Sequence, residues 1–384
     1  MMKTREAGIL FPIFSLASRF GIGALTKEAY DFVDFLERSG QGYWQILPIG
    51  PTGYGNSPYQ PVSSFAGNPY FISLEELIEL GLLTWADVEG IDFGGDQESV
   101  DYGALYENRM PLLKKAYENY IVLTAAGTES EASLSDEQKD TIAELEKEYE
   151  DYRKKEDFWL TDYALYKAIK EQQDQKSWLE WEDGLRLRDP EALSGIMTGC
   201  KDEIECTCFL QFLFDRQWVR LKEYANKKNV KIIGDLPLYV AMDSADSWSH
   251  PEAFLMDSDR KPKLVTGCPP DAFSPTGQLW GNPAYDWESM KKDGFSWWVE
   301  RIRRNYEWFD VIRLDHFHGF CEYYGIPAED ETAEHGKHYP GPGMELFDAL
   351  KKALDDIEMI AEDLGNYTEE NAKLLADSGF PGMK

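Results

Sequence analysis

Two apolar stretches of the chain end in carboxylates, and both have the residue types that glycosidic bond chemistry requires. Residues 309–320 read Phe-Asp-Val-Ile-Arg-Leu-Asp-His-Phe-His-Gly-Phe, and residues 358–365 read Glu-Met-Ile-Ala-Glu-Asp-Leu-Gly. An apolar run followed by charges and a glycine is typical of a buried parallel strand that ends at an active-site rim. We expect Asp315 and Glu362 to leave two strand ends and to meet across one pocket. One carboxylate can then attack the anomeric carbon while the other protonates the leaving oxygen.

Arg313 favours a catalytic role for Asp315. Residues two apart in a strand lie on the same side, so the guanidinium would lie beside the Asp315 carboxylate. We expect it to keep that carboxylate ionised, as a nucleophile must be. Either strand-end acid, taken alone, fits a helix cap or a solvated rim charge equally well.

The remaining pattern predicts an α/β fold that positions these strand ends. Apolar stretches at 8–17, 43–49 and 230–240 alternate with segments of helical periodicity, such as 29–38 and 296–308. In an α/β barrel, the chemistry lies at the carboxyl ends of the strands.

The texture of the chain divides it into three parts. Residues 1–72 are predicted to start the catalytic barrel and to include a substrate loop. Residues 73–225 are predicted to form a mainly helical insertion, in which Ser135-Asp-Glu-Gln138 is a capping box that begins a Glu/Lys-rich helix. Residues 226–384 continue the barrel, and within them 327–342 is predicted to be a surface loop.

A loop rich in glycine and proline follows the 43–49 strand. It spans residues 50–61 and carries Tyr54, Ser57, Tyr59 and Gln60, which suit the wall of a ligand site. An ordinary turn-rich connection has the same composition.

A second long loop is predicted at 267–283. It carries Gln278, Trp280 and Asn282, a ring on which a sugar can stack and amides that can bond hydroxyls. Asp235 interrupts the apolar 230–240 stretch. A carboxylate there must be paired or bind a ligand to offset its desolvation, so Asp235 is a candidate for binding sugar hydroxyls.

Composition argues for a neutral ligand. The formal net charge is -31 and the pI is about 4.5, which disfavours nucleic acid and anionic membranes as partners. Aromatic residues make up 14% of the chain, and such rings suit sugars, although an aromatic-rich core would have the same composition.

Cysteine usage and the amino terminus favour a cytoplasmic location. The five cysteines are odd in number and lack C-x-x-C spacing, so reduced thiols are expected and a zinc site is not. A weak likeness of the start to a signal peptide is broken by Glu6 and Pro12. The sequence contains no run of about 18 apolar residues, the length that a membrane-spanning helix needs.

Five ordered segments resemble the amylomaltases, the 4-alpha-glucanotransferases of glycoside hydrolase family 77. They are residues 50–70, 234–248, 265–287, 313–319 and 361–365. The resemblance implies a TIM (β/α)8 barrel of the alpha-amylase clan type. It also implies a retaining transferase that acts on maltooligosaccharides and α-1,4-glucans without a cofactor or metal.

The resemblance also implies roles for individual residues. Asp315 resembles the nucleophile that forms a glucosyl-enzyme, Glu362 the general acid/base, and Arg313 the charge partner of the nucleophile. The motif implies that donor-site contacts come from Asp235, Tyr59 and His316. The segment Gln278-Leu-Trp-Gly281 resembles a lid on the acceptor side.

The chain departs from the family pattern at two places. Position 318 is His where the family usually has Arg, which removes a permanent positive charge near the nucleophile. The family's third carboxylate, in a His-Asp-Asn segment, would follow position 384. We therefore expect a C-terminally truncated chain with an incomplete barrel of about five strands, weak or inactive as an isolated product.

Other functions remain open at this point. Asp315-His-Phe-His318 contains the His-x-His pattern of metal-dependent barrel hydrolases, and strand alternation would place both histidines on one side, away from Asp315. A non-catalytic protein that only binds maltodextrin would use the same aromatic loops. Hydrolysis differs from transfer only in whether water or a sugar intercepts the intermediate. The oligomeric state is not fixed by the sequence.

Overall fold

The computed structural model describes residues 6–94, 98–125, 134–355, 357–365 and 368–383. The chain divides into two compact units, each built from several segments. Unit 1 contains residues 1–45, 66–168 and 197–230, and unit 2 contains residues 46–65, 169–196 and 231–384.

Unit 1 is mainly helical. Its strands β1 (Gly8–Leu10) and β2 (Tyr43–Gln45) run parallel, with Gly8 opposite Tyr43. Both are shorter than the stretches that the sequence predicts. Pro12 follows β1 closely and has no N–H for a ladder bond, so a 3-10 turn, η1 (Ile13–Ser15), replaces the strand.

The helices of unit 1 occupy most of its described residues. They are α1 (Lys27–Arg38), η2 (Pro69–Phe71), α2 (Leu74–Glu79), α3 (Trp85–Val88), α4 (Tyr102–Ala104), the π-helical turn η3 (Leu105–Arg109), α5 (Met110–Thr124), α7 (Asp136–Lys155) and α11 (Lys201–Lys227). Helix α8 (Asp157–Gln172) and helix α10 (Pro190–Gly199) each cross a boundary between the two units.

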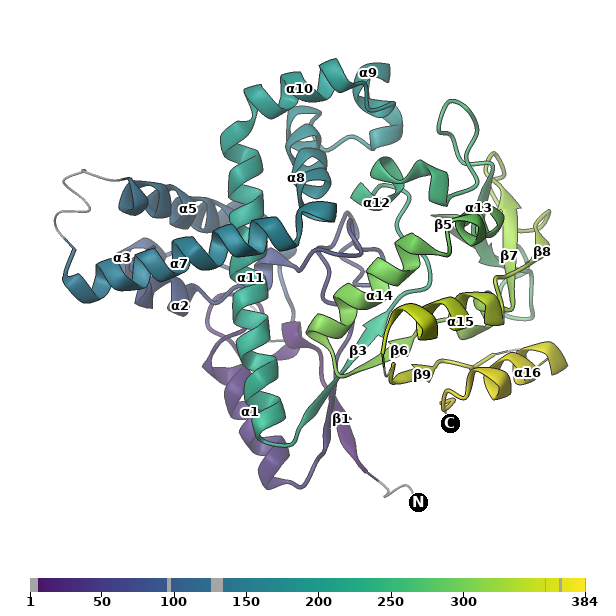
Figure 1. Cartoon of the computed structure of the whole chain (residues 1–384), viewed down its shortest axis with the longest axis horizontal. Helices are drawn as coiled ribbons and strands as arrows, with labels where there is room; N and C mark the ends of the chain where they lie inside the picture. Colours follow the sequence, from purple (N-terminus) through teal and green to yellow (C-terminus); the bar gives the residue numbers. More distant parts are fainter. Residues whose placement is uncertain (1–5, 95–97, 126–133, 356, 366–367, 384) are drawn as a thin grey trace. The chain divides into compact units, whose positions relative to one another are not determined.

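The long helix α11 packs against α5 and α7 (Figure 1), and aromatic side chains make the contact. The Phe209 ring of α11 stacks on Tyr120 of α5 at 4.3 Å between centroids and meets Tyr149 of α7 edge-on at 5.4 Å. The predicted capping box at the start of α7 is confirmed, since Ser135 and Gln138 exchange hydrogen bonds between side chain and backbone. Local capping and burial of one aromatic face together explain this helical layer.

Unit 2 contains the parallel strands of the predicted active site. They are β3 (Lys231–Leu236), β6 (Val311–Leu314) and β9 (Met359–Ala361), with β6 between the other two. The register places Asp235 opposite Arg313. Gly234 is required in β3 because an added Cβ would lie 2.1 Å from the Phe309 ring. Parallel strands joined through helices confirm the α/β class.

A second sheet in unit 2 corrects two loop predictions. Its strands β5 (Gln278–Pro283), β4 (Leu264–Cys268), β7 (Glu322–Pro327) and β8 (Lys337–Pro340) lie in this order and pair antiparallel. The expectation of loops throughout 267–283 and 327–342 is therefore wrong. Strands β5 and β8 pair with the strands that precede them, β4 and β7, and β4 pairs with the distant β7, a pairing that local composition does not reveal.

The described part of unit 2 contains the helices η4 (Trp178–Glu180), α9 (Asp183–Arg186), α12 (Ala245–Ser249), η5 (Pro251–Ala253), α13 (Trp287–Lys292), α14 (Ser296–Trp308), η6 (Phe317–Phe320), α15 (Met344–Ala353) and α16 (Glu369–Ser378). Of these, α14 and α15 lie beside the parallel strands (Figure 1). The predicted bounds of α14 are confirmed, and α15 packs between α14 and α16.

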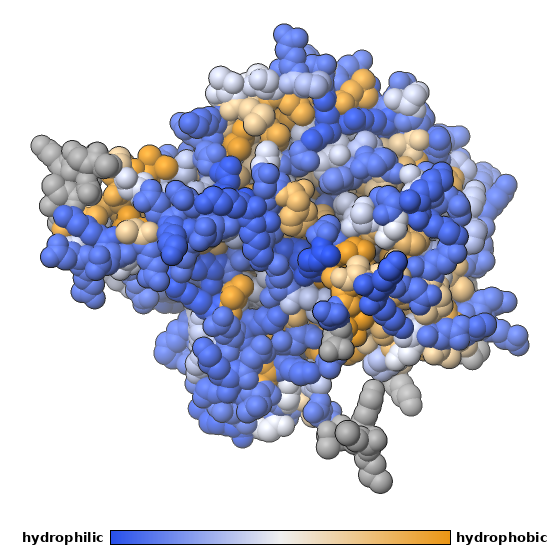
Figure 2. Space-filling model, viewed as in Figure 1, coloured by the Kyte–Doolittle hydropathy of each residue, from blue (hydrophilic) through white to orange (hydrophobic). Residues whose placement is uncertain are grey.

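The surface agrees with the acidic composition. Figure 2 shows a face dominated by hydrophilic residues, on which hydrophobic residues form scattered patches. None of the helices in the described part of the chain is both long and apolar enough to cross a membrane. All five cysteines are free thiols.

Candidate active site

The carboxyl ends of β3, β6 and β9 bring two carboxylates to one cavity of about 300 Å³. Asp315 follows β6, and its N–H donates to Leu236 O at 3.0 Å, at the end of β3. Glu362 follows β9, and its N–H donates to Leu314 O at 3.0 Å. Parallel pairing therefore continues to the last residue of each strand, which places both side chains at the same edge of the sheet.

A buried network of charges lies behind Asp315. Arg313 Nη1 donates to Asp315 Oδ1 at 3.0 Å and to Asp235 Oδ1 at 2.6 Å. Tyr59 donates its hydroxyl to Asp235 Oδ2 at 2.8 Å. One guanidinium thus serves two carboxylates, and a tyrosine satisfies the more buried of them.

Burial raises the pKa of both carboxyl groups in this network. The pKa of Asp315 lies above its ordinary value because burial outweighs the opposing effect of Arg313. The pKa of Asp235 rises to about 6, again because burial outweighs Arg313 and the Tyr59 hydrogen bond. The expected contact between Arg313 and Asp315 is present, but Arg313 only partly offsets the effect of burial on the pKa of Asp315.

Two backbone N–H groups fix the Glu362 carboxylate. His316 N–H donates to Oε2 at 2.9 Å, and Leu364 N–H donates to Oε1 at 3.0 Å. His316 adopts a left-handed conformation with φ of 51°, which allows the turn that carries its N–H to Glu362. Burial lowers the pKa of the His316 imidazole, so the ring is neutral at pH 7.

The left-handed turn also overturns the expectation that two histidines lie on one side. His316 lines the cavity that contains Asp315, whereas His318 lines a different cavity with Asp363. Strand alternation does not apply because β6 ends at Leu314. Within the described ranges, no three His, Cys, Asp or Glu side chains gather closely enough to hold a metal ion.

The cavity wall contains only some of the predicted binding residues. Ser57, Tyr59, Trp280, Asn282 and His316 line it. Asp235 lies behind the wall and reaches it through its hydrogen bond with Tyr59.

Two predicted residues lie outside the cavity lining. Tyr54 is fully exposed, and the exposed Gln278 accepts a hydrogen bond from Trp280 Nε1 at 3.1 Å. A loop composition suited to sugars does not say which of its side chains turn inward.

Gln60 of the predicted substrate loop also lines the cavity and exchanges hydrogen bonds with the Asn282 amide at 3.3 Å. Three further lining residues were missed. They are Pro237, Leu238 and Tyr239. All three follow β3, but the apolar residues after Asp235 favoured a strand through residue 240.

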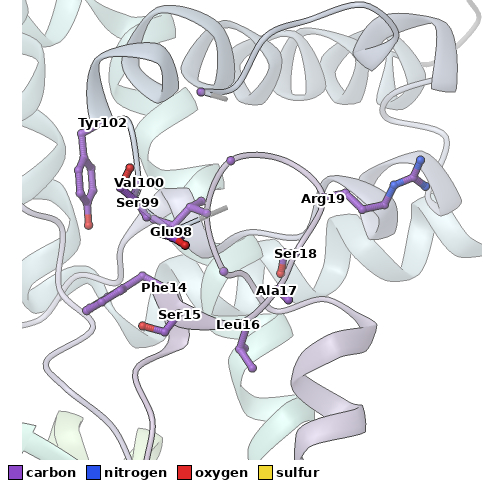
Figure 3. A pocket seen from close by; sticks show the side chains of 14 residues that line it. Phe14, Ser15, Leu16, Ala17, Ser18, Arg19, Glu98, Ser99, Val100 and Tyr102 are labelled. Atoms are coloured by element: carbon purple, nitrogen blue, oxygen red, sulfur yellow. The ribbon is translucent and has the colours of Figure 1, made fainter. Parts of the chain in front are cut away.

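A larger cavity in unit 1, of about 870 Å³, lacks the chemistry of a paired-carboxylate site (Figure 3). Glu98 is the one acid among the described residues that line this cavity. Figure 3 shows the Arg19 side chain extending away from Glu98. Retaining glycosidic chemistry requires two facing carboxyl groups, so the smaller cavity is the candidate active site.

Comparisons with known proteins identify the family of the chain. The profile of a glycoside hydrolase family, described as 4-alpha-glucanotransferase, matches residues 11–384. The 4-alpha-glucanotransferase of Streptococcus pneumoniae serotype 4 is 46% identical over 384 residues, which is all of this chain and 72% of that protein. The Clostridium butyricum 4-alpha-glucanotransferase is 46% identical over 373 residues, 97% of this chain and 72% of that protein.

Solved structures give the same result. The Streptococcus agalactiae amylomaltase, solved in complex with acarbose, matches with a TM-score of 0.91 at 41% identity, covering 99% of this chain and 73% of that one. The Corynebacterium glutamicum amylomaltase shares the fold with a TM-score of 0.75 at 19% identity, covering 98% of this chain and 50% of that one. The chain therefore belongs to the 4-alpha-glucanotransferases, the amylomaltases of glycoside hydrolase family 77.

Proposed function

We propose that the chain moves α-1,4-glucan segments between maltooligosaccharides by a retaining double displacement at the Asp315–Glu362 cavity. The observation that carries the proposal is that these two carboxylates, from neighbouring parallel strands, line one cavity. Retaining enzymes need one carboxyl group as nucleophile and a second as general acid/base, on opposite sides of the scissile bond.

In the first half-reaction, an Asp315 oxygen forms a bond to the anomeric carbon as the bond to the leaving oxygen breaks. Glu362 donates its proton to that oxygen, so the shortened glucan leaves as a neutral alcohol. Arg313 donates to Asp315 Oδ1 at 3.0 Å, which orients the attacking carboxylate. In the second half-reaction, the 4-hydroxyl of an acceptor attacks the same carbon, Glu362 takes the proton, and the bond to Asp315 breaks.

The wall residues supply binding contacts in this proposal. Tyr59, oriented by Asp235, and His316 contact the donor glucose. Trp280 and Asn282 shape the acceptor side, and Ser57 extends the wall. Tyr54 and Gln278 would contact longer glucans outside the cavity.

The proposed architecture is a TIM (β/α)8 barrel of the alpha-amylase clan type, with residues 73–225 as its helical insertion. The parallel strands β3, β6 and β9, with chemistry at their carboxyl ends, support this architecture. The elements between residues 73 and 225 are helical in the described part of the chain, which supports the insertion.

Maltotriose is the substrate that tests the function. The chain is expected to produce longer maltooligosaccharides and glucose, with new linkages in the α configuration by NMR. Asp315→Asn should abolish transfer, and Glu362→Gln should lower its rate by about 10²- to 10⁴-fold. Glu358→Gln, the same change in an exposed side chain just before β9, is the matched control. Unchanged rates in both active-site variants would refute the assignment.

The same experiment separates transfer from binding alone. A protein that only holds maltodextrin would bind maltotriose in calorimetry, form no product, and bind equally after Asp315→Asn. Glucose release without longer products would indicate that water, rather than a sugar, takes the glucosyl group.

A further inference from the structure

Tyr239 belongs to an aromatic wall of the cavity. Its ring centroid lies 6.1 Å from that of Trp280 and 6.2 Å from that of His316. Trp280 and His316 meet nearly perpendicular at 5.2 Å. These three rings, which we call the ring wall, all line the cavity that contains Asp315 and Glu362.

Hydrogen bonds from two buried side chains fix the backbone just before Tyr239. Arg301, which is 1% exposed, donates to Pro237 O at 2.8 Å and to Leu238 O at 3.1 Å. The buried Tyr285 hydroxyl donates to Leu238 O at 2.9 Å. Charged donors on two successive carbonyls fix this segment, so the Tyr239 ring is positioned before any sugar arrives.

The Tyr239 hydroxyl has unused hydrogen-bonding capacity. It forms no hydrogen bond with the part of the chain that the structure describes. It is not among the fully buried unpaired polar atoms, so water can reach it. The nearby hydroxyls differ, since Tyr59 donates to Asp235 and Tyr285 donates to Leu238 O. A tyrosine hydroxyl can both donate and accept, as a sugar hydroxyl can.

The position of the ring wall indicates which sugar it would touch. His316 N–H donates to Glu362 Oε2 at 2.9 Å, so the wall adjoins the proposed acid/base. Glu362 acts on the oxygen that links the donor glucose to the leaving or incoming sugar. Under the proposed function, His316 contacts the donor glucose and Trp280 lies on the acceptor side, so Tyr239, whose ring lies 6.1 Å from that of Trp280, borders the acceptor glucose.

We propose that Tyr239 is a specificity-determining residue for the acceptor: its hydroxyl binds a hydroxyl of the incoming glucose, while the Tyr239 and Trp280 rings pack on the apolar face of that sugar. This inference rests on the proposed function and adds a contact to it. Holding the acceptor raises the chance that a 4-hydroxyl, rather than water, attacks the anomeric carbon as the bond to Asp315 breaks.

Tyr239→Phe tests the proposal because it removes the hydroxyl and keeps the ring. With maltotriose as donor and glucose as acceptor, the acceptor KM should rise about 3- to 10-fold, the range expected for one neutral hydrogen bond. The ratio of hydrolysis to transfer should rise by a similar factor. The first-turnover burst of nitrophenol from a 4-nitrophenyl maltooligoside should fall by a smaller factor than the acceptor KM rises, since that leaving group has no sugar hydroxyl.

Tyr324→Phe is the matched control. Tyr324 and Tyr239 are each 8% exposed, but the Tyr324 hydroxyl donates to Ala333 O at 2.8 Å and does not line the cavity. Tyr324→Phe should lower the melting temperature and leave the acceptor KM unchanged. Tyr239→Phe should do the reverse, because its hydroxyl has no protein partner to lose.

Acceptors that lack single hydroxyls make the test sharper. One monodeoxyglucose should be a poorer acceptor than glucose for the unmodified chain and should lose that handicap with Tyr239→Phe. Equal handicaps in both proteins, or an unchanged acceptor KM, would overturn the proposal. A fall in the nitrophenol burst by the same factor as the rise in acceptor KM would also overturn the proposal, because it would place the hydroxyl on the donor side.

Failure of the proposed function is distinguishable. If the chain transfers nothing, calorimetric binding of maltotriose still decides the role of Tyr239. Weaker binding by Tyr239→Phe than by Tyr324→Phe would keep the contact and reject the reaction. Equal binding would reject the contact.

Discussion

Asp235 should make the stability of the protein depend on pH in a direction opposite to that of most carboxylates. The residue is 3% exposed and shares Arg313 with Asp315. Its pKa rises from 3.8 to about 6, chiefly because burial disfavours the charged form. The folded protein therefore holds this proton more tightly than the unfolded chain does.

The size of the effect follows from the shift. About 2 pKa units correspond to about 3 kcal/mol, at about 1.4 kcal/mol for each unit. Between pH 3.8 and about 6 the folded state binds more protons than the unfolded state, so the free energy of unfolding falls as pH rises through this window. Above the window the loss is complete, and below it the contribution is fully present.

Asp235→Asn tests this reasoning through the difference between two proteins. Urea unfolding of both, at intervals between about pH 4 and about pH 7, should show the unmodified chain losing about 3 kcal/mol relative to the variant. Asp315, which loses a like-charged neighbour in the variant, changes the difference in the same direction. Asp348→Asn, on the exposed face of α15, is the control for removing one carboxylate.

A difference that stays constant across this range would refute the raised pKa of Asp235. A difference of opposite sign would mean that Arg313 and Tyr59 outweigh desolvation, and that the network stabilises the ionised form.

Three further predictions follow from the same strands. Gly234→Ala should lower the free energy of unfolding by about 1–3 kcal/mol because its Cβ would collide with Phe309. Gly195→Ala, in open space on α10, should raise the free energy of unfolding by about 0.5–1 kcal/mol. Calorimetric melting compares the two variants, and equal shifts would contradict the collision with Phe309. Arg301→Met should lower the urea midpoint by an amount equivalent to about 1–3 kcal/mol, since Pro237 O loses the Arg301 donor and Leu238 O keeps only the Tyr285 hydroxyl, and an unchanged midpoint would disprove this role. The acid limb of kcat/KM should rise with an inflection above pH 3.8, because burial raises the pKa of Asp315; an inflection at or below 3.8 would contradict the raised pKa.

Local patterns in the sequence predicted the features that depend on near neighbours. The capping box of Ser135 and Gln138 marked the start of α7, and the periodicity of 296–308 marked α14. The apolar-then-acidic endings located Asp315 and Glu362 at strand ends. Such signals work because capping, helical periodicity and the exit of a chain from a sheet are set by residues a few positions apart.

Tertiary structure alone decided the features that depend on pairing between strands. Strands β5 and β8 form by pairing with β4 and β7, and the residues of β5 and β8 do not by themselves predict that pairing. The left-handed His316 ended the strand alternation.

Residue types at the strand ends thus predicted that two acids meet in one cavity, whereas they did not predict the protonation of these acids or which side chains face inward. Burial raises the pKa of Asp315 by more than Arg313 lowers it. Tyr239, which follows the end of β3, lines the cavity. Desolvation and side-chain direction are properties of the whole packed fold, because each depends on atoms that the chain brings together only when it is folded.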